Sequence, residues 1–174
     1  VWSDIKNAGH ELIVVSSAAT GLGAGKLQID RPQDIPTKQA AAAVGQCELM
    51  YTYDRLFSQY NHTVAQMLLT WEDFDHEVRL YNLRNTLKRL LQLGAIPIIN
   101  ENDTVACEEY SLGDNDTLAA LVAQCGMLTK VVAAKRATSA GVDLIIANGA
   151  HAEVLYDILE GKPVGTRFIG QKEV

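Results

Sequence analysis

Apolar residues recur along this chain in two alternating patterns. Continuous runs of apolar and β-branched residues are typical of buried strands, and apolar residues spaced three and four positions apart are typical of amphipathic helices. The runs predict strands at 11–17, 63–69, 95–100, 142–147 and 165–170. The helical spacing predicts helices at 1–8, 36–61, 76–93, 114–124, 127–140 and 151–159.

This order of elements predicts an α/β fold, a three-layer sandwich in which helices cover both faces of a largely parallel central sheet. Ligands of such sheets bind at the carboxyl ends of the strands. The alternation fails at 124–127, where two helical patterns meet with only Cys125 and Gly126 between them and no strand. We therefore expect a segment to be missing from this joint.

Capping residues and helix breakers predict where several elements begin and end. Gly9 and Gly94 directly follow helical patterns, and glycine commonly ends a helix in a left-handed conformation. Thr70 precedes an acidic stretch, so we expect it to cap a helix. The segment 16–34 is rich in glycine and other small residues, which predicts a loop whose backbone lies close to another part of the molecule.

The composition fits one domain over residues 1–174. Hydrophobic residues make up 48% of the chain, enough to bury a single core. Lys and Arg number 15 against 21 Asp and Glu, a net charge of −6 with no basic block, which excludes nucleic acid as a main partner. No apolar run approaches the ~20 residues of a membrane helix and the N-terminal residues are too polar for a signal peptide, so we expect a cytoplasmic protein with no membrane partner.

Cysteine and histidine give no sign of a metal site. Cys47, Cys107 and Cys125 are scattered and form no C-x-x-C pair, so we expect reduced thiols rather than a disulfide framework or zinc ligands. The four histidines are dispersed, and we interpret each as a surface or packing residue.

Polar side chains gather where predicted strands end. Ser16 and Ser17 follow the first strand, Asn100–Asp103 follows the third, and "GDND" occupies 113–116. Loops of this kind, rich in hydrogen-bonding groups and short of bulk, suit a small polar ligand. Carboxylates and amides together can bind an ammonium group and a neighbouring carboxylate.

The acids at 114–116 have two other interpretations. They resemble half of a calcium-binding loop, but the glycine and terminal glutamate of that motif do not follow in register. They also fit the cap and first turn of a helix, where acids offset the helix dipole. The cap accounts for one acid and leaves the rest of the cluster unexplained.

The segment "GMLTK" at 126–130 is a candidate phosphate site. It puts a glycine, a hydroxyl and a lysine at the start of a predicted helix, where free backbone N–H groups favour an anion. It is not a Walker A loop, because the G-x-x-x-x-G-K-[ST] pattern occurs nowhere in the chain.

In their order, these segments resemble the glutamate 5-kinases of the amino-acid kinase family. The resemblance rests on "VVSSAATG", "KQAAAAVGQ", "YNLRNTL", "IPIINENDTVA", "GDNDTLAALVA", "GMLTK" and "VGTRFIG", which span nearly the whole chain. It implies the amino-acid kinase (carbamate kinase-like) fold. It also implies ATP-dependent phosphorylation of the γ-carboxylate of L-glutamate to glutamyl 5-phosphate, the first step of proline biosynthesis, with Mg²⁺ as the metal cofactor.

The same resemblance implies roles for individual residues. Ser17, Asp103 and Asn115 match residues that bind glutamate, Asp103 at its amino group. Asp114, Asp116 and Lys130 match catalytic residues, and the nucleotide would be held by Gly126, Met127, Leu128, Thr129 and Lys130. The family further implies a homo-oligomer, a dimer or a tetramer, with proline as feedback inhibitor.

Three departures from the family bear on activity. The first strand, with its Lys-x-Gly-Ser/Thr-Ser motif, would lie upstream of residue 1, and a long nucleotide-binding segment is absent between Gln124 and Gly126. Ala18 replaces a family glycine. The alternatives to a glutamate kinase are therefore a truncated, inactive glutamate-binding domain of the same fold, or another member such as an acetylglutamate kinase.

Overall fold

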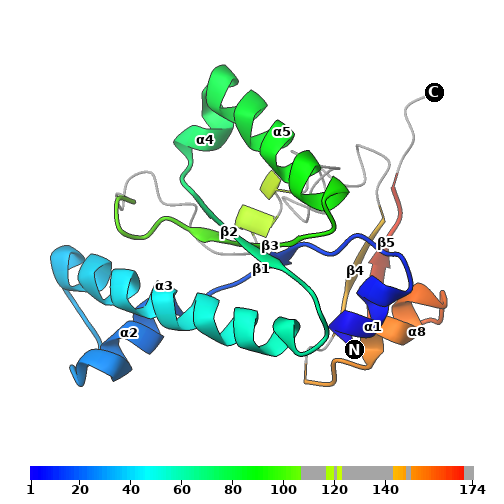
Figure 1. The fold of residues 1–174 in the computed structure, drawn as a ribbon, viewed down its shortest axis with the longest axis horizontal. Coiled ribbons are helices and arrows are strands. Elements are labelled where there is room, and N and C mark those ends of the chain that lie inside the picture. Colours follow the sequence, from blue (N-terminus) through cyan, green and yellow to red (C-terminus); the bar gives the residue numbers. More distant parts are fainter. Residues whose placement is uncertain (107–116, 120, 123–142, 148–149, 171–174) are drawn as a thin grey trace. The chain divides into compact units, whose positions relative to one another are not determined.

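The computed structural model describes residues 1–106, 117–119, 121–122, 143–147 and 150–170 (Figure 1). The chain forms two compact units. The larger unit is Ile13–Asn115, and the smaller unit combines Val1–Leu12 with Asp116–Val174. Each unit is described separately below.

The larger unit is built on a parallel three-stranded sheet in the order β1-β3-β2. In sequence these strands are β1 (Val14–Val15), β2 (Val64–Leu69) and β3 (Ile96–Glu101). β2 pairs with β3 from Val64 opposite Ile96 to Leu69 opposite Glu101, and Val15 of β1 lies opposite Ile99. The predicted parallel sheet is confirmed, and the carboxyl ends of all three strands meet at one edge.

Helices cover both faces of this sheet. One face carries α2 (Ala19–Leu27) and α3 (Ile35–Ser58), and the other carries α4 (Glu72–Asp75) and α5 (Glu77–Gln92) (Figure 1). The amphipathic pattern of α5 buries Leu83 and Leu87, as its spacing predicts. β3 is buried along nearly its whole length, as a central strand between two helical layers must be. The three-layer α/β arrangement is confirmed.

The ends of the helices largely follow the predicted signals. Gly9 and Gly94 have φ of +93° and +78°, the left-handed conformation expected of helix stops. Asp34 caps α3 by accepting a hydrogen bond from the Thr37 backbone N–H at 2.9 Å, and proline occupies the first turn.

Two local predictions are wrong. The sequence predicts a loop at 16–34, but α2 occupies its middle, where Gly23 fits against α3 rather than breaking the helix. Thr70 was expected to cap the next helix, which instead begins at Glu72 with Trp71 at the N-cap position. The Thr70 hydroxyl and backbone N–H both donate to the Asp73 carboxylate. The Thr70 side chain therefore acts as a donor to Asp73 and does not accept a hydrogen bond as a helix cap would.

The smaller unit contains α1 (Trp2–Asn7), β4 (Leu144–Ile146), α8 (Val154–Leu159) and β5 (Thr166–Phe168). β4 and β5 are antiparallel. The hydroxyl of Tyr156 donates to the Asp4 carboxylate, which links α8 to α1. Residues 117–119 and 121–122 are helical, within the predicted helix 114–124, whereas the predicted helix 127–140 lies outside the described residues.

Within the described ranges, no helix is both long enough and apolar enough to span a bilayer.

Candidate functional site

The candidate site is the edge of the larger unit where its three parallel strands end. Hydrogen bonds prolong the strand pairing beyond the strands themselves: the Ser16 N–H donates to the Ile99 carbonyl, and the Asn102 N–H donates to the Leu69 carbonyl, both at 2.8 Å. Ser16, which follows β1, therefore lies beside β3, and Asn102, which follows β3, lies beside β2. Since this is where ligands collect in α/β sheets, the polar residues at this edge are the candidate ligand-binding groups.

Asn100 is the most buried polar residue at this edge, with 3% of its surface exposed. Its side-chain oxygen accepts from the Glu101 backbone N–H at 2.9 Å, and its amide nitrogen donates to Gln46 Oε1 at 3.0 Å. A buried amide with both ends bonded is held in one orientation. Asn100 is thus a fixed point at the end of β3.

Helix α3 contacts the end of β3, the loop that follows it and the residue after β1 through three polar side chains spaced seven residues apart. Gln39 Nε2 donates to the Ala106 carbonyl at 3.3 Å, Gln46 accepts from Asn100, and the Tyr53 hydroxyl lies 2.9 Å from Ser16 Oγ. A spacing of seven is two helical turns, which aligns the three side chains along one face. We call Gln39, Gln46 and Tyr53 the α3 polar row.

The turn after β1 leads directly into α2. Ser17 is exposed there, and Ala18 adopts φ +81° and ψ 0° at the N-cap position of α2. This left-handed conformation suits glycine and costs an alanine free energy because Cβ approaches the backbone. A glycine at this position would adopt it without strain.

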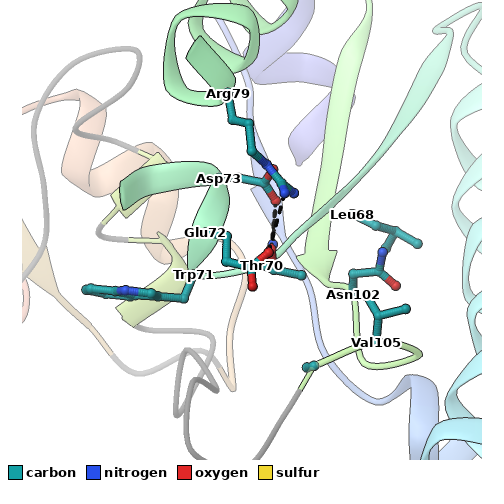
Figure 2. Close-up of a pocket in the computed structure, with 9 residues that line it drawn as sticks. Leu68, Thr70, Trp71, Glu72, Asp73, Arg79, Asn102 and Val105 are labelled. Carbon is teal, nitrogen blue, oxygen red and sulfur yellow. Dashed lines mark hydrogen bonds and ion pairs between the residues drawn. The ribbon is translucent and has the colours of Figure 1, made fainter. Parts of the chain in front are cut away.

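A cavity of about 320 Å³ opens beside the ends of β2 and β3 (Figure 2). Figure 2 shows Asp73 between Thr70 and Arg79, with dashed lines joining the three. Arg79 Nε donates to Asp73 Oδ1 at 2.8 Å, and its Nη1 lies 3.3 Å from a Glu72 oxygen. The guanidinium charge is thus matched by two carboxylates of the same unit. The cavity lining consists of Leu68, Thr70, Trp71, Glu72, Asp73, Arg79, Asn102, Val105 and Ala106.

Asp103 follows Asn102 in the loop after β3 and is partly buried. Burial raises the pKa of its carboxyl group, and the nearby Glu101 carboxylate raises it further. A carboxylate that is partly desolvated beside another negative charge is stabilised by a cation. The chemistry of this position suits an ammonium group.

Of the residues to which the resemblance gives a binding or catalytic role, the structure describes Ser17 and Asp103. Both lie at the carboxyl edge of one sheet, after the neighbouring strands β1 and β3. The other predicted site residues lie outside the described residues: Asp114, Asn115, Asp116, Gly126, Met127, Leu128, Thr129 and Lys130. The roles assigned to all of these residues stay predictions.

The α3 polar row was missed at the level of sequence. The sequence predicts a helix over 36–61 but gives no role to any of these three residues. Their shared spacing of seven residues on the sheet-facing side of an amphipathic helix was the available signal, because polar residues seldom occupy such a face without a partner.

A resident metal is not supported by the part of the chain that the structure covers. It contains no group of three or more His, Cys, Asp or Glu side chains that could hold a metal ion. The acids expected near Mg²⁺, Asp114 and Asp116, are outside this part.

Comparisons with known proteins agree with the fold. Residues 1–142 match the family described as the amino acid kinase family. The glutamate 5-kinase of Clostridium tetani is 41% identical over an alignment 219 positions long, which covers 95% of this chain and 82% of that protein. The glutamate 5-kinases of Clostridium perfringens and Listeria innocua are 38% and 37% identical, each over 99% of this chain and over 86% and 84% of their own lengths.

Proposed function

The chain belongs to the amino acid kinase family, and we propose that it is an ATP-dependent kinase acting on the γ-carboxylate of L-glutamate. The product is glutamyl 5-phosphate, made in the first step of proline biosynthesis. The observation that carries this proposal is the similarity of almost the whole chain to proteins named glutamate 5-kinase.

The reaction requires no covalent bond between the protein and the substrates. A γ-carboxylate oxygen of glutamate attacks the γ-phosphorus of ATP, a new P–O bond forms, and the bond between that phosphorus and the bridging oxygen breaks to release ADP. The nucleophile is already ionised at neutral pH, since a glutamate side chain has a pKa of about 4.3. The protein must therefore position two anions and offset their charge.

The described residues support the glutamate half of this reaction. Asp103 offers a partly buried carboxylate for the substrate ammonium group, and Ser17 offers an exposed hydroxyl after the neighbouring strand. We assign Asn115 to the same substrate.

We assign the ATP half to residues outside the described part. Lys130 and the backbone of 126–130 would contact the phosphates, and Asp114 and Asp116 would orient the catalytic groups. Mg²⁺ would neutralise phosphate charge when bound.

The test is phosphorylation of L-glutamate by the purified protein with ATP and Mg²⁺. We expect activity that is lost on Lys130→Ala and a higher KM for glutamate on Asp103→Ala. Asp30→Ala, at an exposed acid away from the strand ends, is the matched control and should match the unmodified protein. Unchanged rate and glutamate affinity in Asp103→Ala would refute the assignment of that site.

One observation favours a second candidate, an inactive glutamate-binding domain of the same fold. The alignment with the Clostridium tetani relative runs over 219 residues, more than the 174 of this chain, so it includes positions with no counterpart here. If an essential part of the nucleotide site is among them, the protein binds glutamate but not ATP. Calorimetric titration with ATP separates the two candidates, because micromolar binding excludes the inactive one.

Titration with N-acetylglutamate tests the remaining alternative, an acetylglutamate kinase.

Three further properties belong to the proposal, two of them implied by the family and the third by the composition of the chain. We propose a homo-oligomer, dimer or tetramer, with feedback inhibition by proline and action in the cytoplasm. Sedimentation of the purified protein tests the first, and the proline dependence of the rate tests the second.

A further inference from the structure

Gln46 lies where three segments of the larger unit meet. Its side chain contacts Asn100 at the end of β3, and Asn100 comes one residue after Ile99, whose carbonyl accepts from the Ser16 N–H. The preceding residue, Gly45, packs against the Ala19 carbonyl at the start of α2. Gln46 is therefore at the junction of β3 with the turn from β1 into α2.

The hydrogen bonds around Gln46 determine which end of its amide points where. Asn100 Oδ1 is occupied by the Glu101 N–H, so the Asn100 amide nitrogen must face Gln46. A donor requires an acceptor opposite, and this fixes Gln46 Oε1 toward Asn100. The Gln46 amide nitrogen, with its two N–H donors, is consequently directed away from Asn100.

That amide nitrogen is buried and lacks a hydrogen-bond partner among the described residues. Only 8% of the surface of Gln46 is exposed. An unsatisfied buried donor destabilises the folded state, because the group loses its hydrogen bonds to water and gains none in return. An unsatisfied buried donor in a folded protein therefore needs an explanation, and a ligand that supplies the acceptor is one.

We propose that Gln46 contacts the substrate and donates a hydrogen bond to a carboxylate oxygen of L-glutamate from the amide N–H that has no partner in the described part of the chain. This deepens the proposed function and rests on it. Glutamate carries one ammonium group, which needs acceptors, and two carboxylates, which need donors. Asp103 and Glu101 at this edge are acceptors, so the amide of Gln46 supplies a donor that these acids cannot.

The role is distinguishable from mere support of Asn100. Gln46→Glu keeps an oxygen that accepts from Asn100 but replaces the N–H donor with a second oxygen, which repels a carboxylate. If Gln46 only orients Asn100, this variant binds glutamate as the unmodified protein does. If Gln46 contacts the substrate, it binds glutamate much more weakly.

The experiment is calorimetric titration of L-glutamate into the protein without nucleotide. We expect Gln46→Glu to raise the Kd for glutamate tenfold or more, the range of a hydrogen bond to a charged group. Gln59→Glu makes the same change at an exposed glutamine at the end of α3 and should alter the Kd less than twofold. Equal Kd values for Gln46→Glu and the unmodified protein would overturn the inference.

A second measurement does not depend on the variant folding. In the unmodified protein, the side-chain amide signal of Gln46 in a ¹⁵N spectrum should shift when L-glutamate is added, whereas that of Gln59 should not. An unshifted Gln46 signal at saturating glutamate would refute the contact. Failure of the unmodified protein to bind glutamate at all would instead refute the proposed function, so the two failures are separable.

Discussion

Gly23 of α2 and Gly45 of α3 lie so close together that neither position has room for a side chain. A Cβ atom on Gly23 would lie 2.9 Å from the backbone nitrogen of Gly45 and would overlap the Ala41 carbonyl. A Cβ atom on Gly45 would overlap the Ala19 carbonyl. The two helices thus pack backbone against backbone beside the turn that carries Ser17.

Gly45→Ala is therefore expected to destabilise the protein by about 2–3 kcal/mol, the upper part of the range for overpacking, because the obstructing atoms are backbone and cannot rotate away. Urea denaturation measures the change in the free energy of unfolding. Gly25→Ala in α2 is the control, since a Cβ there meets nothing within 4 Å. It should be neutral or stabilising by up to about 1 kcal/mol, because alanine favours helix over glycine. A neutral Gly45→Ala would show that α2 and α3 are less tightly packed.

This pair explains why one sequence prediction failed while most succeeded. Glycine in segment 16–34 was interpreted as a loop signal, whereas two of the packing partners, Gly23 and Gly45, are far apart in sequence. Local propensity carries no information about such a contact. Periodic apolar patterns gave β2, α5 and β3 nearly to the residue, because each of these elements buries a continuous face or run.

Some residues of the candidate site could likewise be predicted from the sequence and others could not. Ser17 and Asp103 were found because polar residues directly after buried strands have a local signature. Gln46 and Tyr53 were not found as site residues, because only their hydrogen bonds place them at the site. Gln46 is bonded to Asn100 and Tyr53 to Ser16, and both partners are distant in sequence.

Ala18→Gly is expected to stabilise the protein. Ala18 has φ +81°, and relief of the left-handed strain should raise the free energy of unfolding by about 1 kcal/mol, partly offset by the greater freedom of glycine in the unfolded chain. Ala40→Gly, at an exposed position within α3, should instead lower it by about 0.5–1 kcal/mol. Thermal and urea denaturation of both variants check the opposite signs. If Ala18→Gly lowers the free energy of unfolding as much as Ala40→Gly does, Ala18 is not strained.

Tyr53→Phe is expected to lower stability by about 1 kcal/mol, because the hydroxyl shares a 2.9 Å hydrogen bond with the buried Ser16. The ring itself remains and keeps its stacking on Phe57. Tyr51→Phe removes an exposed hydroxyl two residues earlier in α3 and should change the free energy of unfolding by less than about 0.5 kcal/mol. If Tyr53→Phe and Tyr51→Phe have the same free energy of unfolding, the Ser16 contact does not stabilise the end of β1.

Asp103→Asn is expected to separate stability from substrate binding. The pKa of the Asp103 carboxyl is raised in the folded protein, by burial first and by Glu101 second, so its ionised form is disfavoured by folding. The resulting destabilisation is absent below the unfolded pKa, near 3.8, and is complete once the pH exceeds the raised folded value. The asparagine variant should therefore be as stable as the unmodified protein at low pH and more stable at neutral pH.

Substrate binding should change in the opposite direction. If Asp103 holds the ammonium group, the neutral amide should weaken L-glutamate binding about tenfold or more, the usual effect of losing a charge-assisted hydrogen bond. Urea denaturation across pH and glutamate titration by calorimetry measure the two effects on one variant, with Asp30→Asn as the exposed control. A variant that gains stability at neutral pH without losing glutamate affinity would confirm the desolvated acid and reject it as the ammonium site. One that loses affinity without the rise in stability would place the ammonium site there and reject the raised pKa.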